Sequence, residues 1–192
     1  MNDPDIINKL DSIKRNIECG YSCDDYHRLI AGRVSEHAEK LGRDIDYIEI
    51  GTLTGNSAEA ILVTGKVRRA VLIDNFSLIW QGKRQSKQLV ESRLAKYAGR
   101  FEVLDGDCRA IAPQLTEMFD VGFVDGDHSE DSCRIDMTNI LPRLRDNGVM
   151  FIHDVGNKPF TYLLPVVAAF VRDNNLNMKL HDVVDGLAEL TR

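Results

Sequence analysis

Short apolar runs recur along this chain at spacings that few folds accommodate. They lie at residues 47–50, 70–73, 101–104, 121–124 and 149–152, so that successive runs start 23, 31, 20 and 28 residues apart. Parallel strands need a crossover of a dozen or more residues, usually a helix, and each interval can hold one. Nearly continuous apolar runs such as VGFV and VMFI are typical of strands covered on both faces. The pattern therefore predicts a doubly wound α/β fold with a mostly parallel sheet.

The segments between and after these runs complete the predicted architecture. Helical periodicity marks residues 57–64, 86–97, 129–144 and 162–172, and Asn147-Gly148 is expected to end the third of these helices before the fifth strand. Residues 179–184 and 187–190 flank Asp185-Gly186, which predicts an antiparallel strand pair on a tight turn. The five runs and this pair make seven strands.

The first 45 residues carry two predicted helices, at 4–17 and 23–41. We expect residues 1–45 to form an N-terminal helical cap on a domain that spans 46–192. Cys19 and Cys23 in this cap are separated by three residues, which matches neither paired zinc-ligand spacing nor a disulfide framework. Free thiols are the expected state of the cysteines, and a redox or metal role for these two is the alternative.

Composition excludes several classes of partner. The chain has 192 residues with 24 Lys and Arg against 30 Asp and Glu, and its formal charge of −6 argues against a binder of duplex nucleic acid. The longest nearly uncharged apolar stretch, residues 160–171, is shorter than the roughly 20 residues that cross a membrane. The acidic start lacks the basic and apolar regions of a secretory signal. We therefore expect a cytoplasmic protein without a membrane partner.

Residues that follow the strands are the candidates for chemistry, because open parallel sheets bind ligands at the carboxyl ends of their strands. The first strand leads into Gly51 and Gly55, which let a ligand approach the backbone near a helix N-terminus. Asp74 ends the second strand, where doubly wound folds place an acid on ribose hydroxyls. The alternatives are glycines that serve only the backbone and an aspartate that caps a turn.

In their order along the chain, these motifs resemble the class I S-adenosylmethionine-dependent methyltransferases. The resemblance runs from about Asp46 to the C-terminus, and VGFVDGDHSEDSCRIDM followed by GVMFIHDV is similar to small-molecule O-methyltransferases with a D-G-x-H motif. It implies a Rossmann-like seven-stranded sheet, mostly parallel, with an antiparallel C-terminal strand and helices on both faces.

The resemblance also implies a binding site for S-adenosylmethionine. Glu49, Gly51 and Gly55 would surround its amino-acid moiety and sulfonium, and Asp74 would accept hydrogen bonds from its ribose. The remaining members of the predicted cofactor set are Thr52, Asn56, Asn75, Asp107, Cys108 and Asp125, of which Asp107 and Cys108 would border the adenine. The E-x-G-x-x-x-G pattern lacks the middle glycine of G-x-G, which disfavours a nicotinamide dinucleotide.

Reaction chemistry is implied for the ends of the fourth and fifth strands. Metal-dependent relatives place an acid, a base and an acidic or amide pair where this chain has Asp125, His128 and His153-Asp154. We predict Asp125, His153 and Asp154 as ligands of Mg²⁺ or Mn²⁺. His128 is the predicted general base, with Asp125 as its catalytic partner, since an imidazole pKa of about 6.5 lies near working pH.

One departure from the pattern of the metal-dependent relatives leaves alternatives open. His153 stands where catechol-type members carry a carboxylate, and an imidazole weakens a site for a hard cation. His128 and His153 could instead be a polar residue of a helix start and a satisfied strand-end histidine. We attribute most nearby acids, among them Asp120 and Asp136, to a solvated helix start.

The predicted function is methyl transfer to a hydroxyl oxygen of a small molecule. One alternative is a non-catalytic module on the same fold that binds an adenosyl ligand or a nucleotide. Another is a related tailoring hydroxylase, which would need oxygen and a redox metal. The sequence does not select the acceptor, and the small cap is compatible with a homodimer.

Overall fold

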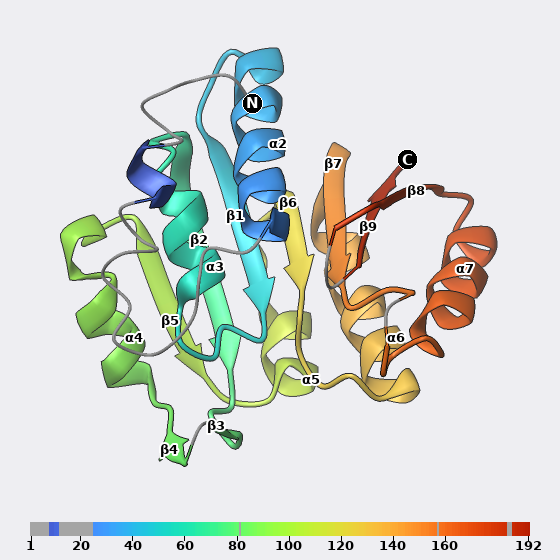
Figure 1. Ribbon diagram of the computed structural model, residues 1–192. Coiled ribbons are helices and arrows are strands. Elements are labelled where there is room, and N and C mark those ends of the chain that lie inside the picture. Colours follow the sequence, from blue (N-terminus) through green and yellow to red (C-terminus); the bar gives the residue numbers. More distant parts are fainter. Residues whose placement is uncertain (1–7, 12–24, 81, 157, 184–185) are drawn as a thin grey trace.

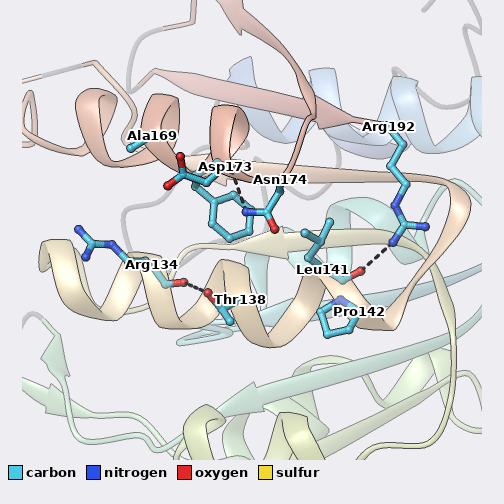
Figure 2. Close-up of a pocket in the computed structure, with 9 residues that line it drawn as sticks. Arg134, Thr138, Leu141, Pro142, Ala169, Asp173, Asn174 and Arg192 are labelled. Atoms are coloured by element: carbon cyan, nitrogen blue, oxygen red, sulfur yellow. Dashed lines mark hydrogen bonds between the residues drawn. The ribbon is translucent and has the colours of Figure 1, made fainter.

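A seven-stranded sheet forms the centre of the computed structural model, which describes residues 8–11, 25–80, 82–156, 158–183 and 186–192 (Figure 1). The strand order is β5-β2-β1-β6-β7-β9-β8. The strands are β1 (Ile45–Ile50), β2 (Val67–Asp74), β5 (Phe101–Asp105), β6 (Phe119–Val124), β7 (Leu144–His153), β8 (Asn177–His181) and β9 (Leu187–Thr191). All seven predicted strands are therefore present.

Strand directions confirm the predicted mixed sheet. The neighbours from β5 to β7 pair in parallel, whereas β9 is antiparallel to both β7 and β8. From β1 the chain moves outward to β2 and β5, and it then returns to β6 on the other side of β1. The strand order thus reverses between β1 and β6, and their carboxyl ends flank the point where such sheets bind ligands.

Helices cover both faces of the sheet (Figure 1). Successive strand residues point to opposite faces, so each central strand contributes side chains to two cores. Tyr47 and Phe123 belong to the core under α2 (Asp25–Leu41), α3 (Asn56–Leu62) and α4 (Lys87–Arg93). Ile48 and Ile152 belong to the opposite core, under α6 (Glu130–Ile140) and α7 (Leu163–Asp173), and the short α5 (Cys108–Ile111) packs beside it. Fold class and two-sided coverage are as predicted.

Helix α2, which belongs to the predicted N-terminal cap, packs on the sheet. Its residues Ile30, Val34 and Ala38 are buried in one core cluster with residues of the sheet. Most of the predicted helix at 4–17, together with Cys19 and Cys23, lies outside the described residues. The two described cysteines, Cys108 and Cys133, are free thiols.

Helix α6 is shorter than the sequence pattern predicted. Ser129 caps it by accepting a hydrogen bond from the Ser132 amide, and the helix ends at Ile140 before a 3₁₀ turn that contains Pro142. Proline cannot supply the amide that would continue the helix. The expectation that Asn147-Gly148 separates helix from strand was wrong, because both residues lie inside β7.

Some local features were not predicted or cannot be placed. Strands β3 (Ile79–Trp80) and β4 (Lys83–Arg84) form a small antiparallel hairpin after β2, and two-residue strands are too short to show a periodic pattern. Asp185 of the predicted terminal turn is outside the described residues.

Among the described helices, none has the length and apolar character needed to cross a bilayer.

Buried charges join the strands at the amino end of the sheet, opposite the switch point. Asp120 is only 2% exposed, and its carboxylate accepts hydrogen bonds from Arg43 at 2.7 and 2.9 Å and from the Asp46 amide at 2.8 Å. Arg145 of β7 forms ion pairs with both Asp46 and Asp120 at 3.0 Å. These contacts tie β1, β6 and β7 together, so Asp120 is not part of the solvated helix start to which we assigned it.

Removing the Asp120 carboxylate should destabilise the fold. Asp120→Ala leaves the buried Asp46 amide without its acceptor, and an unsatisfied buried donor typically costs about 1–3 kcal/mol. Arg43 and Arg145 also lose a partner, but both side chains are partly exposed and can be solvated. Urea unfolding followed by circular dichroism measures the change. Asp146→Ala is the control, because fully exposed Asp146 pairs only with Arg192 among the described residues. Equal stabilities of the two variants would contradict this role of Asp120.

Candidate active site

The loop between β1 and α3 touches the end of β6 at Gly51. Gly51 has a φ of +90°, and a Cβ atom there would lie 1.9 Å from the carbonyl oxygen of Asp125. Any side chain at this position would therefore collide with backbone, so the close approach requires glycine. Gly55, with a φ of +80°, precedes the first turn of α3. Gly51 thus brings the loop after β1 against the end of β6 at the switch point, and Gly55 lies against Val90 of α4.

One polar atom at the start of α3 is buried without a partner. Asn56 Oδ1 makes no hydrogen bond in the described structure, although the atom is not exposed to solvent. Buried polar atoms of folded proteins nearly always have a partner. Asn56 belongs to the predicted cofactor set and could hydrogen-bond a polar ligand, whereas Thr52 of the preceding loop interacts with the Glu49 carboxyl group.

Glu49 lies beneath this loop and is fully buried. Its carboxylate accepts hydrogen bonds from the Tyr47 hydroxyl at 2.7 Å and from the Ser57 hydroxyl at 2.9 Å, which links β1 to α3. Burial raises the pKa of Glu49 to about 7 despite these hydrogen bonds. In this arrangement Glu49 supports the loop from within the core.

Asp74 connects the loops that follow β1 and β2. Its two carboxylate oxygens accept hydrogen bonds from the backbone amides of Leu53 and Phe76, each at 2.6 Å. Both of these residues have a positive φ, near +48°, which non-glycine residues seldom adopt. Burial raises the pKa of Asp74. Since each carboxylate oxygen can accept a second hydrogen bond, Asp74 can still receive ribose hydroxyls.

The predicted adenine end is more open. Asn75 is exposed and accepts a hydrogen bond from the Ser77 amide, and exposed Asp107 caps α5 through the Arg109 amide. The Cys108 thiol instead donates a hydrogen bond to buried Asp136 of α6 at 2.6 Å. Burial raises the pKa of Asp136 to about 6. Asp136 is thus an internal partner of α5, and its assignment to a solvated helix start was wrong.

A cluster of two acids and two histidines lies at the carboxyl ends of β6 and β7. One side-chain oxygen or nitrogen of each residue lies within 4.8 Å of the others, and the members are Asp125, His128, His153 and Asp154. Asp125 Oδ1 and Asp154 Oδ2 are each 3.0 Å from His153 Nδ1. His128 Nε2 lies 2.7 Å from Asp154 and 3.4 Å from Asp125. The structure thus brings together all the residues predicted for catalysis and metal binding.

Local backbone and aromatic rings fix this cluster. Asp154 adopts a positive φ of 59° directly after β7. The ring of Tyr26 lies 4.0 Å from that of His153, and Phe160 stacks on His128 at 4.4 Å. The Tyr162 hydroxyl donates a hydrogen bond to the His128 carbonyl at 2.9 Å. The roles of these three aromatic residues depend on tertiary contacts, for which the sequence carries no motif.

Opposite charges stabilise one another inside the cluster. The carboxylate of Asp125, and then that of Asp154, raises the pKa of His128 to about 9. Burial alone would lower the pKa of His153, but the two carboxylates raise it to about 10. Burial likewise opposes ionisation of Asp154, yet the imidazoles lower its pKa to about 2. In the protein alone, two imidazolium ions therefore balance two carboxylates at neutral pH.

The donor set also fits a divalent cation. Two carboxylates and two imidazoles direct oxygen and nitrogen atoms toward one small volume. His153 Nδ1 lies 3.0 Å from both Asp125 Oδ1 and Asp154 Oδ2, and His128 Nε2 lies 2.7 Å from Asp154 Oδ2. A divalent cation could take the place of the imidazolium protons among these converging donors, because metal ligands bind in their deprotonated form.

Comparison with known proteins identifies the family of the chain. Residues 48–155, more than half of the chain, match a family model described as a methyltransferase domain. No curated protein sequence matches the chain significantly. The chain therefore belongs to this methyltransferase family, and its fold is that of the class I S-adenosylmethionine-dependent methyltransferases.

Solved structures with the same fold include O-methyltransferases. NovP has a TM-score of 0.70 at 18% identity, and the match covers 86% of this chain and 79% of NovP. PaMTH1 from Podospora anserina, bound to SAH, has a TM-score of 0.67 at 17% identity, with 98% and 88% covered. TomG from Streptomyces achromogenes, which is involved in tomaymycin synthesis and was solved with SAM, has a TM-score of 0.65 at 18% identity, with 98% and 90% covered. At these identities, the likeness shows the shared fold.

The buried carboxyl group of Glu49 should make stability depend on pH. Its pKa rises from 4.5 to about 7 on folding, so ionisation opposes the folded state increasingly from pH 4.5 to pH 7. Glu49→Gln removes this penalty, which amounts to on the order of 3 kcal/mol at pH 7 and above. Urea unfolding at several pH values should show the variant gaining stability over the wild type as pH rises.

A matched variant separates this effect from general surface electrostatics. Glu102 is exposed and ion-paired with Arg69, so Glu102→Gln should follow the pH dependence of the wild type. If Glu49→Gln also follows the wild type between pH 4.5 and pH 7, the inference that Glu49 is protonated near neutral pH is wrong.

Proposed function

We propose that this protein transfers a methyl group from S-adenosylmethionine to a hydroxyl oxygen of a small molecule. The observation that carries the proposal is the contact between the glycine loop after β1 and the end of β6, where Asp125 begins the cluster of acids and histidines. This contact would put the cofactor beside groups that can orient and deprotonate an acceptor. O-methyltransferases of the same fold support this choice of acceptor atom.

The cofactor would lie across the carboxyl ends of β1, β2 and β5. Gly51 and Gly55 give the loop beneath its amino-acid end two turns of positive φ, and the unpartnered Asn56 oxygen offers it a hydrogen bond. Asp74 is held by two backbone amides in a position to accept the ribose hydroxyls. Asp107 and Asn75 remain candidates for the open adenine end.

The chain's own groups would prepare the acceptor. Because the cofactor carries an activated methyl group, the protein must align the acceptor oxygen with the sulfonium and remove its proton. Asp125, His153 and Asp154 would hold a divalent cation, which would lower the pKa of a hydroxyl and compete with the protons on the imidazoles. His128 Nε2, which lies 2.7 Å from Asp154 Oδ2, would accept the proton once the cation has displaced the proton that it carries in the protein alone.

Cofactor binding is the first test of this proposal. Calorimetric titration with S-adenosylmethionine and S-adenosylhomocysteine should show saturable binding to the wild type and a large loss in Asp74→Ala. Bound cofactor should also raise the free energy of unfolding by about 2.7 kcal/mol at a hundredfold excess over Kd. Asp173→Ala, which changes an exposed residue of α7, is the control. No binding at millimolar cofactor would contradict the proposal.

Transfer itself tests the role of His128. We would incubate the protein with methyl-labelled S-adenosylmethionine and a panel of phenols, sugars and hydroxylated peptides, and detect the product by mass. Addition of CH₂ identifies methylation, whereas addition of oxygen would identify a hydroxylase. His128→Ala should lower kcat by about 10²–10⁴-fold, the usual contribution of a general base. His37→Gln, an imidazole of α2 outside the cluster, should retain activity, and an unchanged kcat in His128→Ala would contradict the assignment.

A further inference from the structure

We propose that the cation site at the ends of β6 and β7 selects a first-row transition ion over Mg²⁺, because His153 supplies a nitrogen ligand. This inference rests on the cation site of the proposed function and goes beyond it by assigning the class of ion. Its basis is the position, burial and packing of the His153 ring.

The Nδ1 atom of His153 occupies the centre of the donor set. It lies 3.0 Å from Asp125 Oδ1 and 3.0 Å from Asp154 Oδ2. An ion bound by these two carboxylates would therefore meet an imidazole nitrogen as its next protein atom. The side chain of His153 is only 9% exposed, so a water molecule has little room to take the place of this nitrogen.

Packing prevents the imidazole from leaving the site. Tyr26 covers the ring at a centroid distance of 4.0 Å with a tilt of 37°. Phe123 packs against it edge-on at 6.3 Å with an angle of 60°. Rotation of the ring away from the carboxylates would disrupt both contacts, so the nitrogen donor is a fixed part of the site.

The chemistry of the donors then determines which ions bind well. Mg²⁺ prefers oxygen ligands in a nearly ideal octahedron and loses its water reluctantly. Imidazole nitrogen suits transition ions, whose affinities for a given set of ligands generally rise from Mn²⁺ through Fe²⁺ to Co²⁺. A set of one imidazole and two carboxylates therefore favours these ions over Mg²⁺.

Direct metal titration tests the selectivity. Protein freed of metal with a chelator would be titrated by calorimetry with MgCl₂, MnCl₂ and CoCl₂ in separate experiments. We expect the wild type to bind Co²⁺ more tightly than Mn²⁺, and Mn²⁺ more tightly than Mg²⁺ by on the order of tenfold or more. His153→Asp replaces the nitrogen by a carboxylate oxygen and should bring the Mn²⁺ and Mg²⁺ affinities close together. His37→Gln should retain the order of the wild type.

A spectroscopic measurement identifies the ligand without relying on affinity. Electron spin-echo spectra of the Mn²⁺-loaded wild type should show modulation from a coordinated imidazole ¹⁴N nucleus. The modulation should disappear in His153→Asp and persist in His37→Gln. Thermal melts would establish that both variants are folded.

Several results would overturn the inference. Equal affinities of the wild type for Mg²⁺ and Mn²⁺, no ion binding at millimolar concentration, or no nitrogen modulation would each exclude His153 as a selecting ligand. Modulation that persists in His153→Asp would assign the nitrogen to another residue. Methyl transfer measured with Mg²⁺, with Mn²⁺ and with chelator is a separate readout. Transfer without this selectivity would leave the proposed function intact while the inference fails.

Discussion

The backbone contact between Gly51 and Asp125 is the constraint on which the candidate site depends. The Asp125 amide donates a hydrogen bond to the Ile50 carbonyl at 2.9 Å, which extends the pairing of β1 and β6 to the end of both strands. Gly51 turns immediately afterward with a positive φ, where a Cβ atom would overlap the Asp125 carbonyl. The same contact therefore shapes the loop proposed for the cofactor and places the carboxylate that begins the histidine cluster.

Charge is organised differently at the two ends of the sheet. At the amino end, Asp46 and Asp120 are neutralised by arginines whose guanidinium groups are permanently charged, so these ion pairs are structural. At the carboxyl end, Asp125 and Asp154 face imidazoles, which can lose their protons to solvent when a cation binds or accept a proton from a substrate. The choice of histidine over arginine makes the second cluster suitable for chemistry.

Apolar runs and their spacing were sufficient to predict the sheet, because strands that are buried on both faces consist almost entirely of apolar residues. The ends of individual helices were less predictable. Helix α6 ends before Pro142, and residues 147–148, where we expected it to end, lie in a strand. The sequence also predicted that Asp125 lies near the residues at the end of β7, because parallel strands end at the same edge of a sheet. It could not predict that Tyr26 packs on His153, because that contact depends on how α2 docks on the sheet.

A crystal structure of the protein with S-adenosylhomocysteine and Mn²⁺ tests the central claim most directly, since anomalous scattering locates the ion. We expect cofactor density over the loop from Gly51 to Gly55, with the ribose at Asp74. We also expect an anomalous peak within bonding distance of Asp125, His153 and Asp154. Cofactor density elsewhere, or full cofactor occupancy with no peak at this cluster, would contradict the proposed site.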